Sequence, residues 1–172
     1  MIPQENLSGL EEALEVDIQN FYAELFEKGH IASLYNLEGF TKIEPDYSSE
    51  KINKALQKGY INYFKEGWAT RVSRLKFFTN IEPNYCSEEI KMAVQNGYVD
   101  IFKKGLIHKA NELKELTGIE PSERVVRRSY DNLFEKGWID GALELKEFTG
   151  IPPSQDILKK YPQYAKYFGD EK

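Results

Sequence analysis

The stretch that decides the fold is residues 125–154, VVRRSYDNLFEKGWIDGALELKEFTGIPPS, because its pattern occurs four times along the chain. A tyrosine stands seven residues before Gly137 and a phenylalanine three before it. A leucine stands eight residues after this glycine and a threonine twelve after it, and an isoleucine and a proline follow. Self-similarity at a nearly fixed period is the signature of a repeat protein. The recurring residues are Tyr22, Tyr60, Tyr98 and Tyr130; Phe26, Phe64, Phe102 and Phe134; Gly29, Gly67, Gly105 and Gly137; Leu37, Leu75, Leu113 and Leu145; Thr41, Thr79, Thr117 and Thr149; Ile43, Ile81, Ile119 and Ile151; Pro45, Pro83, Pro121 and Pro153.

Each unit of the pattern predicts a pair of helices. The tyrosine and the phenylalanine lie four residues apart, so they share one face of a first helix, helix A, which the glycine ends. A second apolar stripe with helical spacing predicts helix B, which the proline stops. A serine then stands ready to cap the next helix A. The second stripe holds Leu34, Val72, Ala110 and Ala142, the four leucines, and Phe40, Phe78, Leu116 and Phe148; helix B should end at Lys42, Asn80, Gly118 and Gly150; the serines are Ser48, Ser87, Ser122 and Ser154.

Apolar stripes on both helices cannot be buried within one hairpin, so the hairpins are expected to stack. The sequence predicts an all-α, right-handed α–α superhelix of about four and a half repeats, as a single domain over residues 1–172. The repeats are expected at about residues 8–45, 46–83, 84–121 and 122–153, with a closing half-repeat at 154–168. The glycine spacings of 38, 38 and 32 residues predict that helix A is almost two turns longer in the second and third repeats. Gly59 and Gly97 would then lie inside helices, at a close helix–helix approach or at a kink.

The recurring aromatic residues are expected to form the core. The coupling of each tyrosine to a phenylalanine four residues later favours burial over the display of hydroxyl groups in a groove. Trp68 and Trp138 directly follow their glycines. Packing between adjacent hairpins is favoured for them over a role as binding anchors, because His30 and Leu106 occupy the same position in the other repeats.

The unit resembles the pentatricopeptide and tetratricopeptide repeats, which are families of αα-hairpin superhelices. The resemblance covers residues from about 18 to 154 and is carried best by Lys136-Gly137, Ala142, Leu145 and Pro153-Ser154. It implies a superhelix, and it raises the hypothesis of RNA-base reading by a polar residue early in helix A and another just after the proline. The alternative is that these are solvated helix residues and turn residues. The positions are Asn20, Lys58, Asn96 and Arg128, and Asp46, Asn84, Ser122 and Ser154.

Composition argues against several classes of function. The net charge of −5 disfavours generic nucleic-acid binding, although residues 65–128 are mildly basic. No apolar stretch is long enough for a membrane span, Met1–Asn6 has no apolar signal core, and the single cysteine, Cys86, fits a cytoplasmic protein. His30 and His108 form no ligand pair, and no phosphate-binding loop is evident. We therefore expect a protein that is not an enzyme and uses no metal ion or small-molecule cofactor.

The leading hypothesis is a non-catalytic scaffold that binds a protein or peptide on the concave face lined by helix A. A glutamine recurs at one repeat position of helix A, and amide groups can bind an extended peptide backbone. The rival is single-stranded RNA binding on the same face, and a small homo-oligomer formed through an end cap is a third hypothesis. The basic residues that would serve RNA are Arg71, Arg74, Lys103, Lys104, Arg124, Arg127 and Arg128. The expected partner-binding residues are Gln19, Asn20, Gln57, Lys58, Gln95, Asn96, Arg127 and Arg128.

Overall fold

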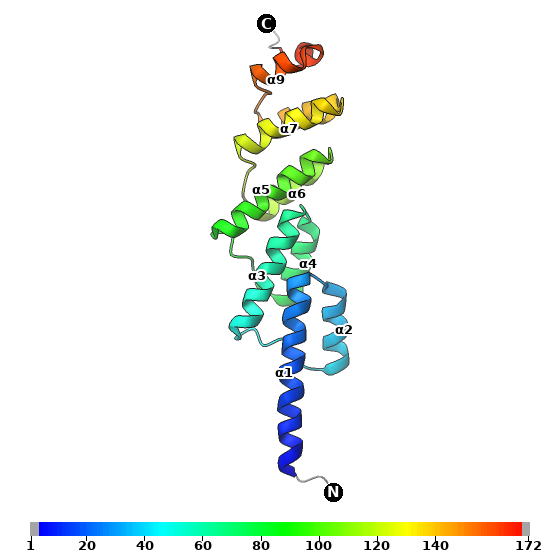
Figure 1. Cartoon of the computed structure of the whole chain (residues 1–172), viewed down its shortest axis with the longest axis vertical. Helices are drawn as coiled ribbons and strands as arrows, with labels where there is room; N and C mark the ends of the chain where they lie inside the picture. The colour runs from blue at the N-terminus through cyan, green and yellow to red at the C-terminus, as the bar shows by residue number, and fades with distance from the viewer. Residues whose placement is uncertain (1–3, 170–172) are drawn as a thin grey trace. The chain divides into compact units, whose positions relative to one another are not determined.

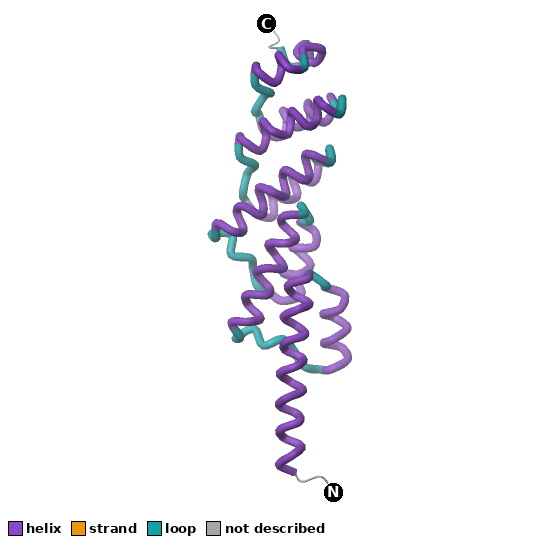
Figure 2. Tube along the Cα trace, in the orientation of Figure 1, coloured by secondary structure: helices purple, strands orange, loops and turns teal. Residues whose placement is uncertain are grey.

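The structure is a computed structural model that describes residues 4–169, with side chains described at residue 9 and from residue 11 on (Figure 1). The prediction that Met1–Asn6 holds no apolar signal core lies outside these described side chains. The described residues form helices joined by short loops and contain no strand, which confirms the all-helical class (Figure 2). The elements are α1 (Gln4–Lys28), α2 (Ile31–Thr41), α3 (Glu50–Lys65), α4 (Ala69–Thr79), α5 (Glu88–Lys103), α6 (His108–Thr117), α7 (Glu123–Glu135), α8 (Ile139–Thr149), α9 (Gln155–Lys160) and the 3-10 helix η1 (Pro162–Tyr167).

The helices end where the repeat predicts. All four recurring glycines and all four residues expected to end helix B have a positive φ, between 53° and 70°. This left-handed conformation lets the last carbonyl groups of a helix find hydrogen-bond donors, and it is open to glycine and tolerated by asparagine. The residues are Gly29, Gly67, Gly105 and Gly137, and Lys42, Asn80, Gly118 and Gly150.

Serine begins some of the helices as predicted. The Ser87 and Ser154 hydroxyl oxygens accept hydrogen bonds from the N–H groups of Ile90 and Ile157, at 3.2 and 3.4 Å. Ser122 precedes α7, but its side chain makes no capping hydrogen bond. The predicted cap is therefore confirmed at two of these three serines.

The prediction that helix A gains almost two turns is wrong. α3 and α5 have 16 residues each and α7 has 13, so the gain is less than one turn. The other extra residues form a turn before each longer helix, and this turn places a half-buried tyrosine against a core phenylalanine. Tyr47 packs against Phe26, and Tyr85 packs against Phe64, with ring centroids 6.3 and 6.1 Å apart. The cap predicted at Ser48 is also wrong, because this residue lies in the turn and α3 begins two residues later.

The chain divides into two compact units. Unit 1 comprises Met1–Asn62 and Arg74–Asn84, and unit 2 comprises Tyr63–Ser73 and Tyr85–Lys172. The border runs through α3 and α4, so the second hairpin contributes residues to both units. That the chain forms one domain stays a prediction.

In unit 1, α1 and α2 form a hairpin whose inner side chains are fully buried, as Tyr22, Phe26 and Leu34 show. The prediction for Phe40 in the helix B stripe is wrong, because its side chain is 91% exposed. The equivalent Phe78 packs against the first hairpin. Phe40 has no earlier hairpin within the described residues against which it could pack.

In unit 2, the α5/α6 and α7/α8 hairpins stack, with α5 packed against α7. Phe148 of α8 contacts the rings of Tyr98 and Phe102 on α5, at 6.5 and 6.3 Å between centroids. The following segment, α9 and η1, closes this core. Its Phe168 is 6% exposed and packs against Tyr130 and Phe134 of α7.

Gly59 and Gly97 mark close helix–helix approaches, as one of the two interpretations predicted. A Cβ atom on Gly59 would lie 2.3 Å from the carbonyl oxygen of Phe26, within unit 1. A Cβ atom on Gly97 would lie 2.1 Å from the carbonyl oxygen of Phe64, within unit 2. Both helices continue through the glycine. The absent side chain therefore lets one helix A lie directly on the backbone of the preceding one.

Candidate functional site

The three glutamines predicted to bind a partner have a structural role that the sequence did not reveal. The Gln19 Nε2 donates to the Glu44 carbonyl oxygen at 2.9 Å, and its Oε1 accepts from the Asp46 N–H at 2.8 Å. The amide thus spans Pro45, which has no N–H of its own. One donor and one acceptor of each amide are used in this way, so partner binding by these side chains stays a prediction. Equivalent bridges join Gln57 to Glu82 and Asn84, and Gln95 to Glu120 and Ser122.

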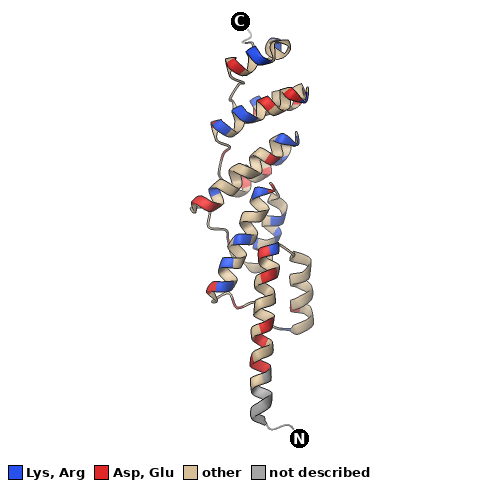
Figure 3. Ribbon diagram, viewed as in Figure 1, with Lys and Arg blue, Asp and Glu red and all other residues tan. Residues whose placement is uncertain are grey.

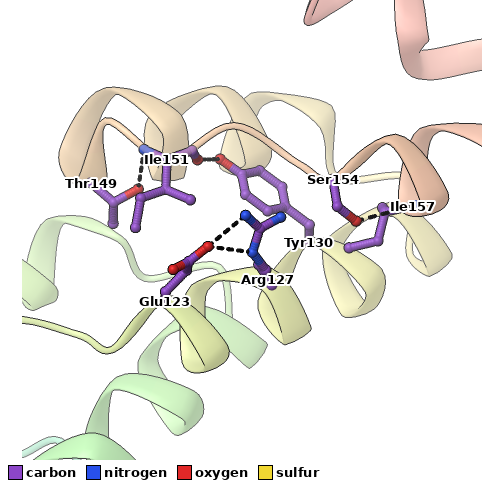
Figure 4. Close-up of polar contacts among 7 residues, drawn as sticks. All are labelled: Glu123, Arg127, Tyr130, Thr149, Ile151, Ser154 and Ile157. Atoms are coloured by element: carbon purple, nitrogen blue, oxygen red, sulfur yellow. Dashed lines mark hydrogen bonds and ion pairs between the residues drawn. The ribbon is translucent and has the colours of Figure 1, made fainter.

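The tyrosine hydroxyl groups are also occupied, which confirms burial over display. The Tyr130 hydroxyl donates to the Ile151 carbonyl oxygen at 2.6 Å, and the Ile151 N–H donates to the Thr149 hydroxyl at 3.2 Å (Figure 4). Thr149 in turn donates to the Leu145 carbonyl oxygen of α8 at 2.7 Å. Desolvation by burial raises the pKa of the Tyr130 phenol. The same tyrosine–isoleucine bond occurs at Tyr22–Ile43, Tyr60–Ile81 and Tyr98–Ile119, at 2.6–2.7 Å.

A groove between α1 and α3 in unit 1 brings two of the predicted residues together. It has a volume of about 570 Å³, and Asn20 and Lys58 are among its lining residues. Ala23 and Ala55 also line it and are only 6% and 5% exposed, so small side chains form its base. Its charges are divided between the two helices. α1 contributes Glu24 and Glu27, and α3 contributes Lys51, Lys54 and Lys58 together with Glu50.

One ion pair and one hydrogen bond cross this groove, and their side chains are exposed. The Lys58 Nζ lies 3.2 Å from the Glu27 Oε1, and the two side chains are 60% and 51% exposed. The Lys51 Nζ donates to the Asn20 Oδ1 at 2.6 Å. Exposed pairs of this kind contribute about 0.2–1 kcal/mol each, so a partner can exchange them for its own charges at little cost.

In unit 2, the predicted residues lie on two helices that pack against each other. Asn96 is exposed on α5, and Arg127 and Arg128 are exposed on α7. The Arg127 guanidinium binds one oxygen of the Glu123 carboxylate through Nε at 2.8 Å and Nη2 at 2.5 Å (Figure 4). Arg127 therefore has an intrahelical partner.

The predicted packing of a tryptophan between adjacent hairpins is seen for Trp138. A Cβ atom added to Gly105 would lie 3.0 Å from Cε3 of Trp138. The Trp138 ring therefore packs on the preceding hairpin within unit 2. The ring stays 42% exposed, with the Lys136 ammonium 4.4 Å from its centroid. Trp68 is 39% exposed and carries the Arg71 guanidinium 3.8 Å from its centroid.

The described side chains include no group of three or more His, Cys, Asp or Glu that could hold a metal ion. Within the described residues, every helix is too short or too polar to cross a bilayer.

Sequence reasoning missed the division of charge in the α1/α3 groove. The signal was present, because Lys51, Lys54 and Lys58 are spaced by three and four residues and so share one face of a helix. These lysines lie 24 (51 − 27) to 34 (58 − 24) residues after Glu27 and Glu24 of α1, and only stacking brings the two helices alongside each other.

No protein-family model matches the chain, and no significant match is found among curated proteins or solved structures.

Proposed function

We propose that the chain is a non-catalytic scaffold that binds a protein or peptide on the exposed face of its A helices. In this proposal the hairpins continue into a right-handed superhelix related to the pentatricopeptide and tetratricopeptide repeats. Support comes from the recurring tyrosine–isoleucine bonds and from the glycines, which place one helix A on the next within each unit. Side-by-side A helices give a continuous surface of the kind that solenoids use for binding.

The observation that carries the proposal is the groove between α1 and α3. Its base of alanine lets a peptide backbone come close, and its walls offer carboxylates on one side and ammonium groups on the other. An extended peptide that carries both signs of charge fits this arrangement, because each wall supplies a counter-charge. The described groove contains no arrangement of nucleophile and base that would suggest a reaction.

Peptide selection tests this proposal. Peptides selected from a random display library against the full chain should bind at least about tenfold more weakly to the Lys58→Glu variant, because the reversal removes a counter-charge. The matched control is Lys159→Glu on α9, where the lysine side chain is 79% exposed and lies in the other unit. Equal affinity for both variants, or failure to select any binding peptide, would contradict the proposal.

Single-stranded RNA is the second candidate, and exposed Arg124 and Arg128 on α7 favour it. RNA binding depends on counterion release and therefore weakens steeply with salt. We expect no measurable binding of single-stranded RNA to the full chain even at low salt, because the protein carries a net charge of −5. Tight binding that falls steeply with salt would replace the first proposal with this one.

A further inference from the structure

A second groove lies in unit 1, between α1 and α2, and has only Glu24 in common with the α1/α3 groove. Its volume is about 630 Å³, and Phe21, Leu25, Leu37 and Phe40 line it. Phe40 is 91% exposed and Phe21 is 49% exposed. Leu14, which stands two helical turns before Phe21 on the same face of α1, is 59% exposed. Contiguous exposed apolar side chains of this size mark interaction surfaces.

The repeat shows what normally covers this face. Phe78, the equivalent of Phe40, packs against the rings of Phe26 and Tyr35, at 6.4 and 4.6 Å between centroids. In unit 2 the equivalent Phe148 packs in the same way on α5. The side chain at this position therefore contacts a preceding hairpin in both units, whereas Phe40 has no such contact among the described residues.

Another hairpin of the same kind does not fit on this face. The helix A position just before the tyrosine holds Gly59 and Gly97, which touch the preceding backbone, or the buried Ser129. A single Cβ atom at either glycine would already lie within 2.3 Å of a carbonyl oxygen. In α1 the same position holds Phe21, whose ring blocks that approach. The occupant must therefore fill the groove in a different way.

The charges beside the groove indicate the chemistry of that occupant. Asp17 and Glu24 lie roughly 40° and 60° around the axis of α1 from Phe21, at 100° per residue. Residues 11–17 hold Glu11, Glu12, Glu15 and Asp17 without a basic residue, and the ribbon of Figure 3 shows these acidic positions in red along α1. Lys28 also lines the groove, where it pairs with Glu24, so the basic charge in the lining is already matched. Two copies of this face would therefore oppose the carboxylates of residues 11–17 to one another. A basic partner gains attraction in place of that repulsion.

We propose that the α1/α2 groove binds an amphipathic helix of a partner protein, with apolar anchors in the groove and Lys or Arg beside Asp17 and Glu24. This site shares Glu24 with the α1/α3 groove and differs from it in the rest of its lining, and it extends the proposed function. Helix-in-groove binding uses anchors spaced like one helical face, which suits a groove walled by two helices. Every described side chain from residue 11 to residue 17 is exposed, so a docked helix also gives this part of α1 a packing partner.

The test uses a synthetic helical peptide of leucine and lysine, with leucines at positions i, i+3, i+4 and i+7. It should bind the full chain, and Phe40→Ser should weaken binding at least about tenfold because an apolar contact is lost. Phe77→Ser is the matched control. Phe77 is 84% exposed in the same unit and does not line the groove, so its loss should change affinity by less than about twofold. Neither variant removes a buried side chain.

Amide hydrogen exchange of the protein and a change in the charge of the peptide provide two independent tests of binding at this groove. Binding should slow amide exchange in residues 11–17, and a peptide with glutamate in place of lysine should bind at least about tenfold more weakly. The proposal fails if the lysine peptide does not bind, if both phenylalanine variants weaken it equally, or if the glutamate peptide binds as well. It also fails if sedimentation shows a dimer that Phe40→Ser dissociates, because the occupant is then a second copy.

Discussion

At the scale of single residues, hydrogen bonds hold each repeat together as well as apolar contacts do in the core. The tyrosine, threonine and isoleucine of each repeat share a chain of hydrogen bonds that ties helix A to the loop after helix B. Because a buried carbonyl without a donor is costly, each tyrosine hydroxyl has a reason to recur that packing alone does not supply. The sequence predicted the burial of this row, and hydrogen-bonding partners explain why phenylalanine does not replace it.

A glycine pair tests the close approach of α1 and α3. Gly59→Ala should lower the free energy of unfolding by about 1–3 kcal/mol, because the new Cβ atom would lie 2.3 Å from the Phe26 carbonyl oxygen and force the helices apart. Gly39→Ala, in the same unit, should raise it by about 0.5–1 kcal/mol, because nothing lies within 4 Å and alanine favours the helix. Urea titrations of the two variants should therefore shift in opposite directions. A shift of both variants in the same direction would contradict the close approach of α1 and α3 at Gly59.

At the scale of helices, the sequence predicted the elements better than their connections. The recurring glycines and prolines determine where helices end, and the structure follows them. The glycine spacing predicts that the six additional residues of the longer repeats extend helix A, but part of them builds the turn that carries Tyr47 or Tyr85. Periodicity could not show this, because a tyrosine in a turn and a tyrosine on a helix face look alike in sequence. Only the ring contacts with Phe26 and Phe64 separate the two.

The closing segment of unit 2 provides a test at this scale. Phe168→Ala should lower the free energy of unfolding by about 3 kcal/mol, because a buried ring that packs on Tyr130 and Phe134 is lost. Tyr167→Ala is the control, since that side chain is 46% exposed and its removal should cost less than about 1 kcal/mol. Chemical denaturation monitored by circular dichroism gives both values. Equal losses would show that η1 does not close the core.

At the scale of the whole molecule, the candidate surfaces were harder to predict than the core. A core position repeats because every hairpin needs it, so four copies reveal it in one sequence. The α1/α3 groove depends on side chains of two repeats, and the exposure of Phe40 depends on which described hairpins lie beside α2. Neither property can be predicted from the sequence of a single repeat. The glutamine row shows the converse risk, because a recurrence that suggested binding has a structural cause.

Both units share one dependence on pH, through their buried tyrosines. Desolvation raises the pKa of Tyr22 and Tyr47 in unit 1, and of Tyr98 and Tyr130 in unit 2, above the ordinary value of 10.0. A phenol whose pKa is raised by folding leaves stability intact below pH 10, where both states are protonated. Above it the unfolded chain loses its protons first, so stability falls by up to about 1.4 kcal/mol per pH unit for each tyrosine.

Titration with alkali should therefore show phenolate absorbance rising together with the loss of helical circular dichroism, in both units over the same pH range. Tyr98→Phe should reduce the slope of stability against pH by one proton, because one raised phenol is removed. This variant also leaves the Ile119 carbonyl without its donor, so its stability at neutral pH should be lower by about 1–2 kcal/mol. The slope of stability against pH and the stability at neutral pH are separate measurements. If every tyrosine forms phenolate while the helices persist, these hydroxyl groups are accessible to water. The tyrosine–isoleucine hydrogen bonds would then not hold the repeats together.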